Sequence, residues 1–274
     1  MVLRPYGGRA LPGGGGLLRG PGLELRLADP IVAIDAEART VTFAKGRTTS
    51  YDALVLATGS APFVPPVPGA TGPGRFVYRT LADLAAIRDH AGRATRGAVV
   101  GGGLLGLEAA NALLSLGLDT SVVEFAPRLM PVQVDEGGGQ ALRRLVEGLG
   151  VRVLTGASTQ RIEDADSACG VFAGGDPLDV DLVVFSAGIR PHDALARAAG
   201  LEIGEWGGVL VDERCSTSAP DVYAVGECAS AAGRCWGLVA PGYVQAEVVV
   251  DRLAAGRSCW PSTAPDAAAT SASP

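Results

Sequence analysis

Aromatic residues, histidine and lysine are scarce in this sequence of 274 residues. Aromatic residues make up 5% of the chain, there are two histidines, and Lys45 is the only lysine. No apolar run approaches the roughly 18 to 20 residues of a membrane-spanning helix, and the first residues lack the pattern of a secretion signal. The net charge of -6 disfavours a nucleic-acid partner, as does the lack of arginine clusters with interleaved aromatics. We therefore expect a cytoplasmic protein that acts on small molecules, without a membrane or nucleic-acid partner.

The cysteines lack the spacing of a redox or metal centre. No C-x-x-C pair occurs among the five cysteines, which are Cys169, Cys215, Cys228, Cys235 and Cys259. A dithiol centre, a zinc site and an iron-sulfur site are therefore not indicated. His90 and His192 lie far apart in the sequence, and neither is expected to be catalytic. We predict no metal ligands and no catalytic side chain.

Hydrophobic residues, at 47% of the chain, suffice for the core of one or two domains. Residues 1–22 are rich in glycine and proline without periodicity, which predicts a disordered N-terminal segment. Residues 257–274 are small and polar with repeated proline, which predicts a flexible tail. The glycine run 13–16 follows no strand and is not expected to be a phosphate-binding loop.

The pattern between these ends predicts an α/β fold. Residues 23–43 alternate apolar and polar residues, which predicts a β-meander, and residues 51–60 end in a buried strand. The proline-rich segment 62–69 predicts a surface connector. Further meander strands are expected over 158–188, strands over 208–213 and 221–227, and a helix over about 242–254.

The central third of the sequence alternates strands and helices. A short helix is expected over 81–90. The expected elements that follow are a strand over 97–101, a helix over 104–116, a strand over 120–124, a helix over 139–149 and a strand in the segment "VRVLTG". Such alternation is typical of a doubly wound parallel sheet.

A glycine-rich turn joins the first strand and helix of this unit. The segment that fits G-x-G-x-x-G consists of Gly101, Gly102, Gly103, Leu104, Leu105 and Gly106. The first glycine of such a motif permits the turn, the second lets the backbone approach a pyrophosphate, and the third allows close packing of the helix on the strand. The helix N-terminus then holds the phosphates. The sequence therefore predicts a dinucleotide-binding turn.

Glu124 ends the next strand, 23 positions after Gly101. This spacing is close to the ~20 expected of the acid that binds the adenosine ribose hydroxyls. A carboxylate there also repels a 2'-phosphate, which favours NAD over NADP, with Arg128 as the residue that could reverse the preference. The alternative for Glu124 is a solvated acid at a strand end.

Three further segments carry a resemblance to a known family. "TSAPDVYAVGE" (217–227) resembles the second flavin-binding motif of the pyridine nucleotide-disulfide oxidoreductase superfamily. "LVLATGS" (54–60) resembles the A-T-G strand of that superfamily, and "FSAGIRP" (185–191) the strand that leaves its NAD domain. With the glycine turn, these segments occur in the order of the superfamily over roughly residues 23–255.

Longer segments narrow the resemblance. "YDALVLATGSAPFVPPVPG", "VVGGGLLGLEAANAL", "VVEFAPRLMPVQVDEGGG" and "GLVAPGY" are most similar to the reductase portion of the NADH-dependent assimilatory nitrite reductase large subunit. Rubredoxin and ferredoxin reductases are the neighbouring alternatives. The resemblance implies FAD and NAD(H) as cofactors, with hydride passing from NADH to the flavin and electrons then leaving to an acceptor protein or domain.

The resemblance also implies roles for residues of the FAD domain. Glu227 matches the acid that binds the flavin ribitol, and Gly226 lets the chain pass close to the cofactor. Thr58 and Gly59 match the A-T-G turn. The alternatives are an acid between a strand and a loop for Glu227 and an ordinary strand end for Thr58 and Gly59.

Other implied positions lie on two helices and on one strand end. The helix beginning near Gly242 and Tyr243 would direct its N-terminus at the flavin pyrimidine edge. Glu108 matches an acid near the nicotinamide, with a carboxylate on the helix surface as the alternative. Gly188 lies in the strand end that leaves the NAD domain.

The resemblance implies two dinucleotide-binding, Rossmann-like domains with β-meanders. A partial FAD domain is expected over 23–82 and 201–256, and an NAD domain over 83–200. The FAD domain is discontinuous and would lack its first strand–turn–helix unit, so reduced FAD affinity is expected. Because no siroheme or iron-sulfur ligand region follows, we expect an electron-input module, which could form an oligomer. The alternative is a module that binds NAD(H) without flavin and catalyses nothing.

Overall fold

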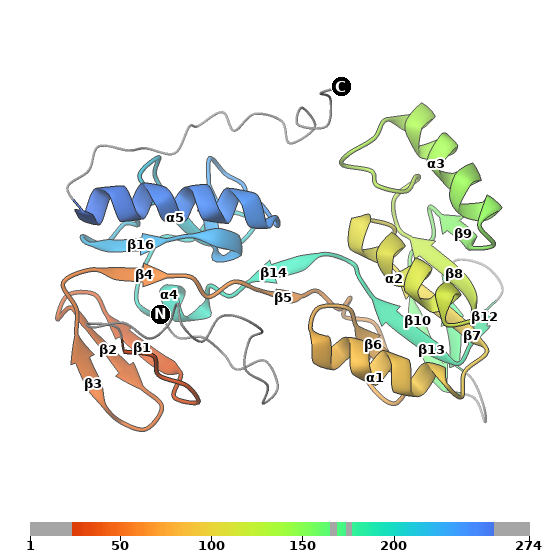
Figure 1. The fold of residues 1–274 in the computed structure, drawn as a ribbon, viewed down its shortest axis with the longest axis horizontal. Coiled ribbons are helices and arrows are strands. Elements are labelled where there is room, and N and C mark those ends of the chain that lie inside the picture. The colour runs from red at the N-terminus through yellow and green to blue at the C-terminus, as the bar shows by residue number, and fades with distance from the viewer. Residues whose placement is uncertain (1–23, 165–168, 174–176, 255–274) are drawn as a thin grey trace. The chain divides into compact units, whose positions relative to one another are not determined.

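The computed structural model describes residues 24–164, 169–173 and 177–254 (Figure 1). The expected disordered segment 1–22 and tail 257–274 lie outside these residues. Contacts divide the chain into two compact units: the second unit is Pro62–Ile189, and the first unit is the rest of the chain on both sides of it. The division falls at 61/62 and 189/190, whereas the sequence placed it at 82/83 and 200/201.

The second unit is built on a five-stranded parallel sheet. Its strands, in spatial order, are β6 (Arg75–Val77), β13 (Leu182–Phe185), β7 (Arg96–Val100), β8 (Asp119–Glu124) and β9 (Arg152–Thr155). Because β6 pairs with β13, the segment before the first helix belongs to this unit, which moves the boundary toward the N-terminus. The sequence prediction of a parallel α/β sheet is confirmed, but the helices cover one face only, because the antiparallel meander covers the other face in place of a second helical layer.

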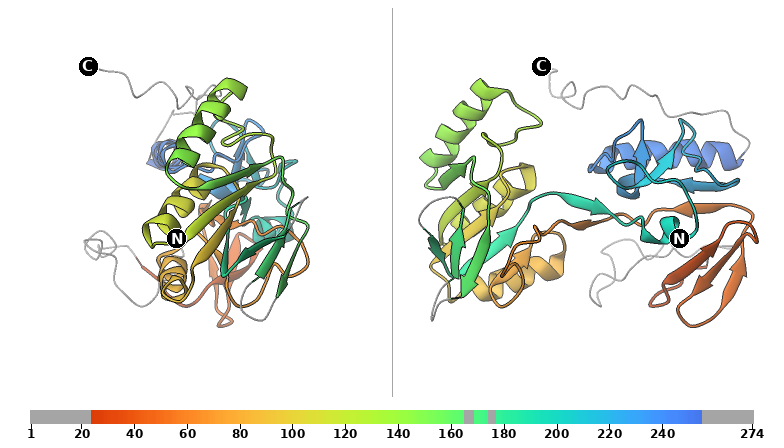
Figure 2. Two further views of the ribbon diagram at one scale, coloured as in Figure 1. Left: turned by 90° about the vertical axis from the view of Figure 1, so that its right-hand side faces the viewer. Right: turned by 180° about the vertical axis from the view of Figure 1, so that it is seen from behind.

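Two layers cover this sheet, as parallel sheets require. The helices are α1 (Leu81–Ala91), α2 (Leu104–Ser115) and α3 (Glu136–Gly148), and the antiparallel meander strands are β10 (Arg161–Asp164), β11 (Cys169–Phe172) and β12 (Leu178–Val180). Val99 and Val122 pack with the helices, whereas Val100 and Phe185 pack with the meander. Figure 2 shows the helices on one face of the sheet and the meander on the other. The alternation of side chains along each strand thus fills both cores.

Capping side chains set where two of these helices begin. Thr80 accepts a hydrogen bond from the backbone N–H of Asp83, and the Asp83 carboxylate accepts from the backbone N–H of Thr80, so α1 begins with a capping box. Asp135 accepts a hydrogen bond from the backbone N–H of Gly138. This cap starts α3 at Glu136, three residues before the predicted start, because a capped first turn tolerates three glycines.

The first unit holds several small sheets. Its strands are β1 (Ile31–Asp35), β2 (Thr40–Phe43), β3 (Thr48–Ser50), β4 (Leu54–Leu56), β15 (Val209–Val211), β16 (Val222–Ala224) and β17 (Ala229–Ala231). The first three form an antiparallel meander, of which the sequence predicted the part up to residue 43 and not β3. β4 pairs with β16 in parallel, and β15 pairs with β17 in parallel. The helices are α4 (Ala194–Ala198), α5 (Val239–Ala254) and the short 3-10 helix η1 (Gly226–Cys228). Two segments, β5 (Ser60–Pro62) and β14 (Ile189–Pro191), pair where the chain passes between the units.

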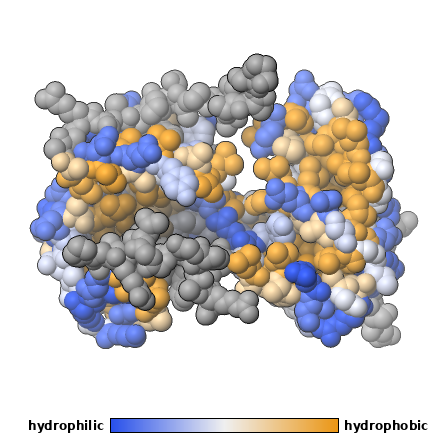
Figure 3. Space-filling model, viewed as in Figure 1, coloured by the Kyte–Doolittle hydropathy of each residue, from blue (hydrophilic) through white to orange (hydrophobic). Residues whose placement is uncertain are grey.

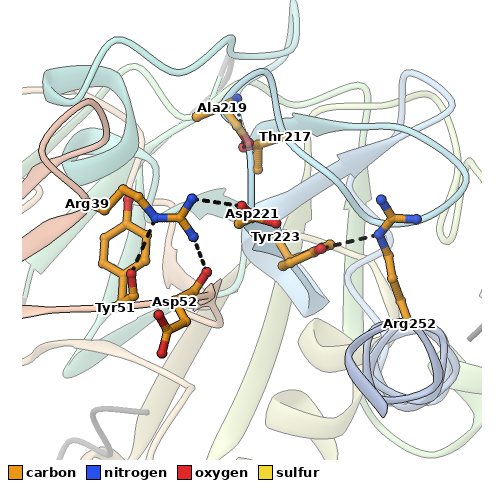
Figure 4. Close-up of polar contacts among 8 residues, drawn as sticks. All are labelled: Arg39, Tyr51, Asp52, Thr217, Ala219, Asp221, Tyr223 and Arg252. Carbon is orange, nitrogen blue, oxygen red and sulfur yellow. Dashed lines mark hydrogen bonds and ion pairs between the residues drawn. The ribbon is translucent and has the colours of Figure 1, made fainter. Parts of the chain in front are cut away.

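A polar cluster holds the meander of the first unit against the paired strands β4 and β16 (Figure 4). The Arg39 guanidinium donates to the Asp221 carboxylate at 2.9 Å and to the backbone carbonyls of Tyr51 and Asp52. Arg252 of α5 donates to the buried Tyr223 hydroxyl at 3.2 Å. Arg39, in the turn between β1 and β2, thus has three acceptors in the segments that lead into β4 and β16.

No helix in the described parts of the chain is long and apolar enough to cross a membrane.

Asp181 fastens three strands of the second unit at the end opposite the glycine turn. Its carboxylate accepts hydrogen bonds from the backbone N–H of Thr95 at 2.7 Å, the Thr95 hydroxyl at 2.8 Å and the backbone N–H of Arg96 at 2.8 Å. Burial raises the pKa of Asp181, but the hydrogen bonds from Thr95 and Arg96 outweigh burial and leave this pKa below its ordinary value. The ionised carboxylate therefore stabilises the start of β7.

We predict that Asp181→Asn lowers the free energy of unfolding by about 1 to 3 kcal/mol at pH 7, because a charged acceptor of four hydrogen bonds from Thr95 and Arg96 is replaced by an amide. A lowered folded-state pKa stabilises the fold above the unfolded pKa, near about 4, and this contribution is lost as the pH falls through the folded pKa. Urea unfolding at pH 7 and at about pH 3 should therefore show a smaller difference between wild type and variant at the lower pH. Asp179→Asn, at an exposed neighbouring position, is the control. An equal effect of both substitutions would contradict this role of Asp181.

Candidate functional site

The glycine turn lies at the carboxyl end of β7, with β13 on one side of this strand and β8 on the other. The chain leaves β7 through α2 toward β8 and β9, whereas β13 and β6 lie on the opposite side. The strand order therefore reverses at β7. In open α/β sheets, ligands bind in the crevice outside the carboxyl ends of the strands at such a reversal.

Three glycines of the turn are closely packed, and at Gly101 and Gly106 a side chain would collide with backbone atoms. Gly101 has a φ of +117°, and a Cβ atom there would lie 2.3 Å from the backbone oxygen of Ser186, which follows β13. A Cβ atom on Gly106 would lie 2.0 Å from the backbone oxygen of Gly101, and one on Gly102 would lie 2.6 Å from a Leu129 methyl carbon. The turn, the helix and the neighbouring strand end thus form one close-packed group.

Gly103 differs from the other three glycines. Apart from Gly103, its two chain neighbours and the backbone of its own helix, no described residue has an atom within 4 Å of the place where its Cβ would be. Gly103 is also the N-cap of α2, and none of the described side chains caps this helix end. The uncapped amides and the helix dipole make the start of α2 suitable for an anion.

The first turn of α2 is apolar. Leu104 is 52% exposed and Leu105 is 41% exposed. Figure 3 shows apolar surface over α2 and α3 of this unit, and Leu145 is exposed on α3. The first turn of α2 has no acidic side chain, so the backbone amides at the start of this helix can bind an anion without repulsion from that turn.

Glu124 lies at the carboxyl end of β8 and is buried, with 8% of its surface exposed. One carboxylate oxygen accepts from the backbone N–H of Gly102, and the other accepts from the backbone N–H of Ala126 at 2.6 Å. This placement is not that of a solvated acid. Glu124 ties the glycine turn to the loop after β8, and its oxygens retain lone pairs for a further donor such as a ribose hydroxyl.

The loop after β8 is anchored to the same turn. The backbone N–H of Met130 donates to the Gly102 carbonyl at 2.9 Å, and Leu129 is fully buried against Gly102. The Arg128 guanidinium donates to the carbonyls of Val134 at 3.0 Å and Pro131 at 3.1 Å. Arg128, which could have favoured a 2'-phosphate, therefore holds its own loop together.

Two further predicted positions of the second unit are exposed or open. Glu108 is an exposed residue of α2. Gly188, after β13, has a φ of +103°, and none of the described residues lies within 4 Å of its missing Cβ. Its carbonyl accepts from the backbone N–H of Phe63 at 2.8 Å. Their roles toward a nucleotide stay predictions.

In the first unit, the A-T-G turn is held by the segment after β14. The Thr58 hydroxyl donates to the His192 carbonyl at 2.7 Å, and the backbone N–H of His192 donates to the Gly59 carbonyl at 2.9 Å. Gly59 has a φ of +68°. The turn thus has a fixed shape, to which His192 contributes backbone groups.

A second polar group surrounds η1, directly after β16. Glu227 is half-buried and accepts from the Ser60 hydroxyl at 2.8 Å. The backbone N–H of Gly226 donates to the side-chain oxygen of Gln245 at 2.7 Å, and a Cβ on Gly242 would lie 3.3 Å from the Gly226 Cα. The start of α5 and the flavin-type motif are therefore in close contact.

Gln245 was not predicted from the sequence. It is 1% exposed, and its side-chain nitrogen has no hydrogen-bond partner among the described residues. A buried donor without a partner is costly unless a ligand supplies an acceptor. One feature of the sequence could have indicated its burial: Gln245 precedes the apolar Val248 and Val249 by three and four positions, so all three lie on one face of the helix. Both valines are buried as well.

The helix that carries Gln245 begins earlier than predicted. α5 starts at Val239 and not near Gly242, because Pro241 is tolerated within the first turn of a helix. Gly242 and Tyr243 therefore lie about one turn inside the helix, and Tyr243 is 69% exposed.

The described cysteine side chains are free thiols that are not poised for chemistry. Burial, followed by the charge of Asp212, raises the pKa of Cys215 to about 11, and burial also raises the pKa of Cys235. The third free thiol, Cys228, is buried. Within the described residues, no group of three or more His, Cys, Asp or Glu could hold a metal ion.

Comparisons with known proteins agree with this geometry. Residues 18–267 match the family model described as pyridine nucleotide-disulphide oxidoreductase. The chain is 56% identical to the nitrite reductase [NAD(P)H] large subunit of Klebsiella oxytoca over 82% of this chain and 24% of that protein. It is 48% identical to the nitrite reductase (NADH) large subunit of Escherichia coli strain K12 over 85% of this chain and 28% of that protein. The chain therefore spans about a quarter of the length of these curated relatives.

Solved structures give the same result. The ferredoxin reductase for the CYP199A2 system from Rhodopseudomonas palustris matches with a TM-score of 0.81 and 32% identity, over 87% of this chain and 60% of that chain. The resemblance seen in the sequence motifs is confirmed. The chain belongs to the pyridine nucleotide-disulphide oxidoreductase family.

Proposed function

We propose that the chain is an electron-input module of an FAD-dependent NADH oxidoreductase, which takes hydride from NADH and passes electrons to an acceptor protein or domain. The observation that carries the proposal is the glycine turn at the strand-order reversal. There, Gly101 and Gly106 are packed against backbone while Gly103 and the uncapped start of α2 are open. This arrangement suits a pyrophosphate, which needs backbone donors and close approach.

In the second unit, the glycine turn and Glu124 have distinct parts in holding the dinucleotide. The amides at the start of α2 bind the pyrophosphate, and Glu124 accepts from the ribose hydroxyls. The Glu124 charge lies beside the turn, and the Arg128 guanidinium is bonded within its loop. Both features support NADH over NADPH, because a 2'-phosphate would meet a carboxylate without a facing cation.

In the first unit, the residues around η1 fit a flavin. Glu227 and Ser60 form a polar pair suited to ribitol hydroxyls, the Gly226 and Gly242 backbones are closely packed, and Gln245 has a buried donor in need of an acceptor. These residues would hold a flavin, which would supply hydride acceptance and electron release in steps of one or two electrons. The hydride step needs no acid or base from the protein, so the side chains of this site bind and orient.

The acceptor is, in this proposal, a redox centre carried by another protein or domain. One similar solved structure is a ferredoxin reductase, and two similar curated proteins are large subunits of nitrite reductases. We place the module in the cytoplasm, where NADH is available.

The visible absorption spectrum tests the flavin and hydride parts together. After incubation with FAD and desalting, the protein should retain a flavin band near ~450 nm that anaerobic NADH bleaches, and NADPH should require higher concentrations. Glu227→Ala should weaken FAD binding about tenfold, because charge-assisted hydrogen bonds to the ribitol are lost. Colourless protein that still binds NADH would contradict the flavin part, and a retained band that NADH leaves unchanged would contradict the hydride part.

Two substitutions in the turn separate packing from binding. Gly106→Ala places a methyl group 2.0 Å from the Gly101 oxygen and should lower stability by about 1 to 3 kcal/mol. Gly103→Ala enters open space at a φ of -80°, so it should leave the melting temperature within about 2 °C of wild type. Because its methyl group occupies the approach of the pyrophosphate, Gly103→Ala should weaken NADH binding by about tenfold or more. Thermal unfolding and calorimetric titration with NADH measure both effects, and normal NADH binding by Gly103→Ala would count against the proposed site.

A further inference from the structure

The loop after β8 presents a large aromatic side chain to solvent beside the glycine turn. Phe125, the residue directly after Glu124, is 78% exposed. Among the phenylalanines whose burial the structure describes, Phe43 and Phe185 are buried, and Phe63 and Phe76 are partly buried. Phe125 alone in this set is exposed. Exposure alone is ordinary for a single apolar side chain. What distinguishes Phe125 is its place directly after Glu124, on the loop that is bonded to the glycine turn.

The backbone around Phe125 is fixed on both sides. The Glu124 carbonyl accepts from the backbone N–H of Ala157 at 2.9 Å, and the Ala126 carbonyl accepts from the backbone N–H of Gly156 at 2.8 Å. The Ala126 N–H donates to the Glu124 carboxylate at 2.6 Å. Phe125 is thus exposed on a well-anchored backbone, which lowers the entropy cost of using it for recognition.

A dinucleotide bound with its pyrophosphate on the glycine turn would extend toward Phe125. Glu124 is hydrogen-bonded to Gly102 of the turn, so a pyrophosphate on the turn brings the adjoining ribose to Glu124. The base is bonded to that ribose and therefore reaches the residues next to Glu124. Phe125 is the first of these residues, and its ring offers a flat apolar face of the kind on which bases stack.

We propose that Phe125 is the platform on which the adenine base of the dinucleotide stacks. The inference rests on the proposed function of the glycine turn and names the residue that recognises the base. Phe125 is then a binding residue for the adenine half and leaves the hydride chemistry to the other half of the molecule.

The test measures the affinity for ADP-ribose by calorimetry. This probe keeps the adenine, both phosphates and the adenosine ribose and lacks the nicotinamide, so its binding does not depend on flavin. Phe125→Ala should raise the dissociation constant by roughly 5- to 100-fold, the range given by base–aromatic stacking. Phe125→Tyr, which keeps the ring, should bind within about twofold of wild type. Both variants should keep the wild-type melting temperature, because the side chain is exposed.

Val132→Ala is the matched control, since Val132 lies in the same loop and is 89% exposed. This variant should bind ADP-ribose as the wild type does. Unchanged affinity in Phe125→Ala, or an equal loss in Val132→Ala, would overturn the role of Phe125 and leave the proposed function standing. Wild-type protein that fails to bind ADP-ribose would overturn the proposed function and this inference with it.

Discussion

The second unit depends on close contacts between backbone atoms at the carboxyl end of β7, where two glycines leave no room for a side chain. Gly101 packs on the carbonyl of Ser186, and Gly106 packs on the carbonyl of Gly101. These contacts bring the strand end, the start of α2 and the end of β13 together. The geometry leaves Gly103 facing open space and the first amides of α2 without side-chain caps from the described residues. A packing constraint thus produces an anion-binding surface.

Glu124 extends this constraint to the neighbouring strand. Its buried carboxylate joins Gly102 of the turn to Ala126 of the next loop, and Met130 returns a backbone hydrogen bond to Gly102. The turn and the loop after β8 therefore behave as one hydrogen-bonded structure. In the proposed function, the Glu124 carboxylate selects the ribose of the nucleotide. The same carboxylate also fixes the backbone of the glycine turn that would hold the phosphates, so one residue serves both the fold and the choice of nucleotide.

Local patterns in the sequence predicted the parts of the molecule that depend on nearby residues. The alternation of β7, α2 and β8 follows from apolar periodicity and glycine spacing. Long-range partners were not predictable in this way: Ser60 meets Glu227 across 167 positions, and Asp181 meets Thr95 across 86 positions. The pairing of β6 with β13, which joins the segment before α1 to the second unit, is likewise a long-range contact that no local pattern indicates.

The measurement that tests the central claim most directly is hydrogen–deuterium exchange with and without ADP-ribose. The claim is that the turn at the end of β7 holds the pyrophosphate. The account predicts slower exchange of the amides of residues 101–106 when ADP-ribose is bound, with the meander strands β1 to β3 unchanged. Saturating ADP-ribose that leaves the exchange of residues 101–106 unaltered would contradict the account.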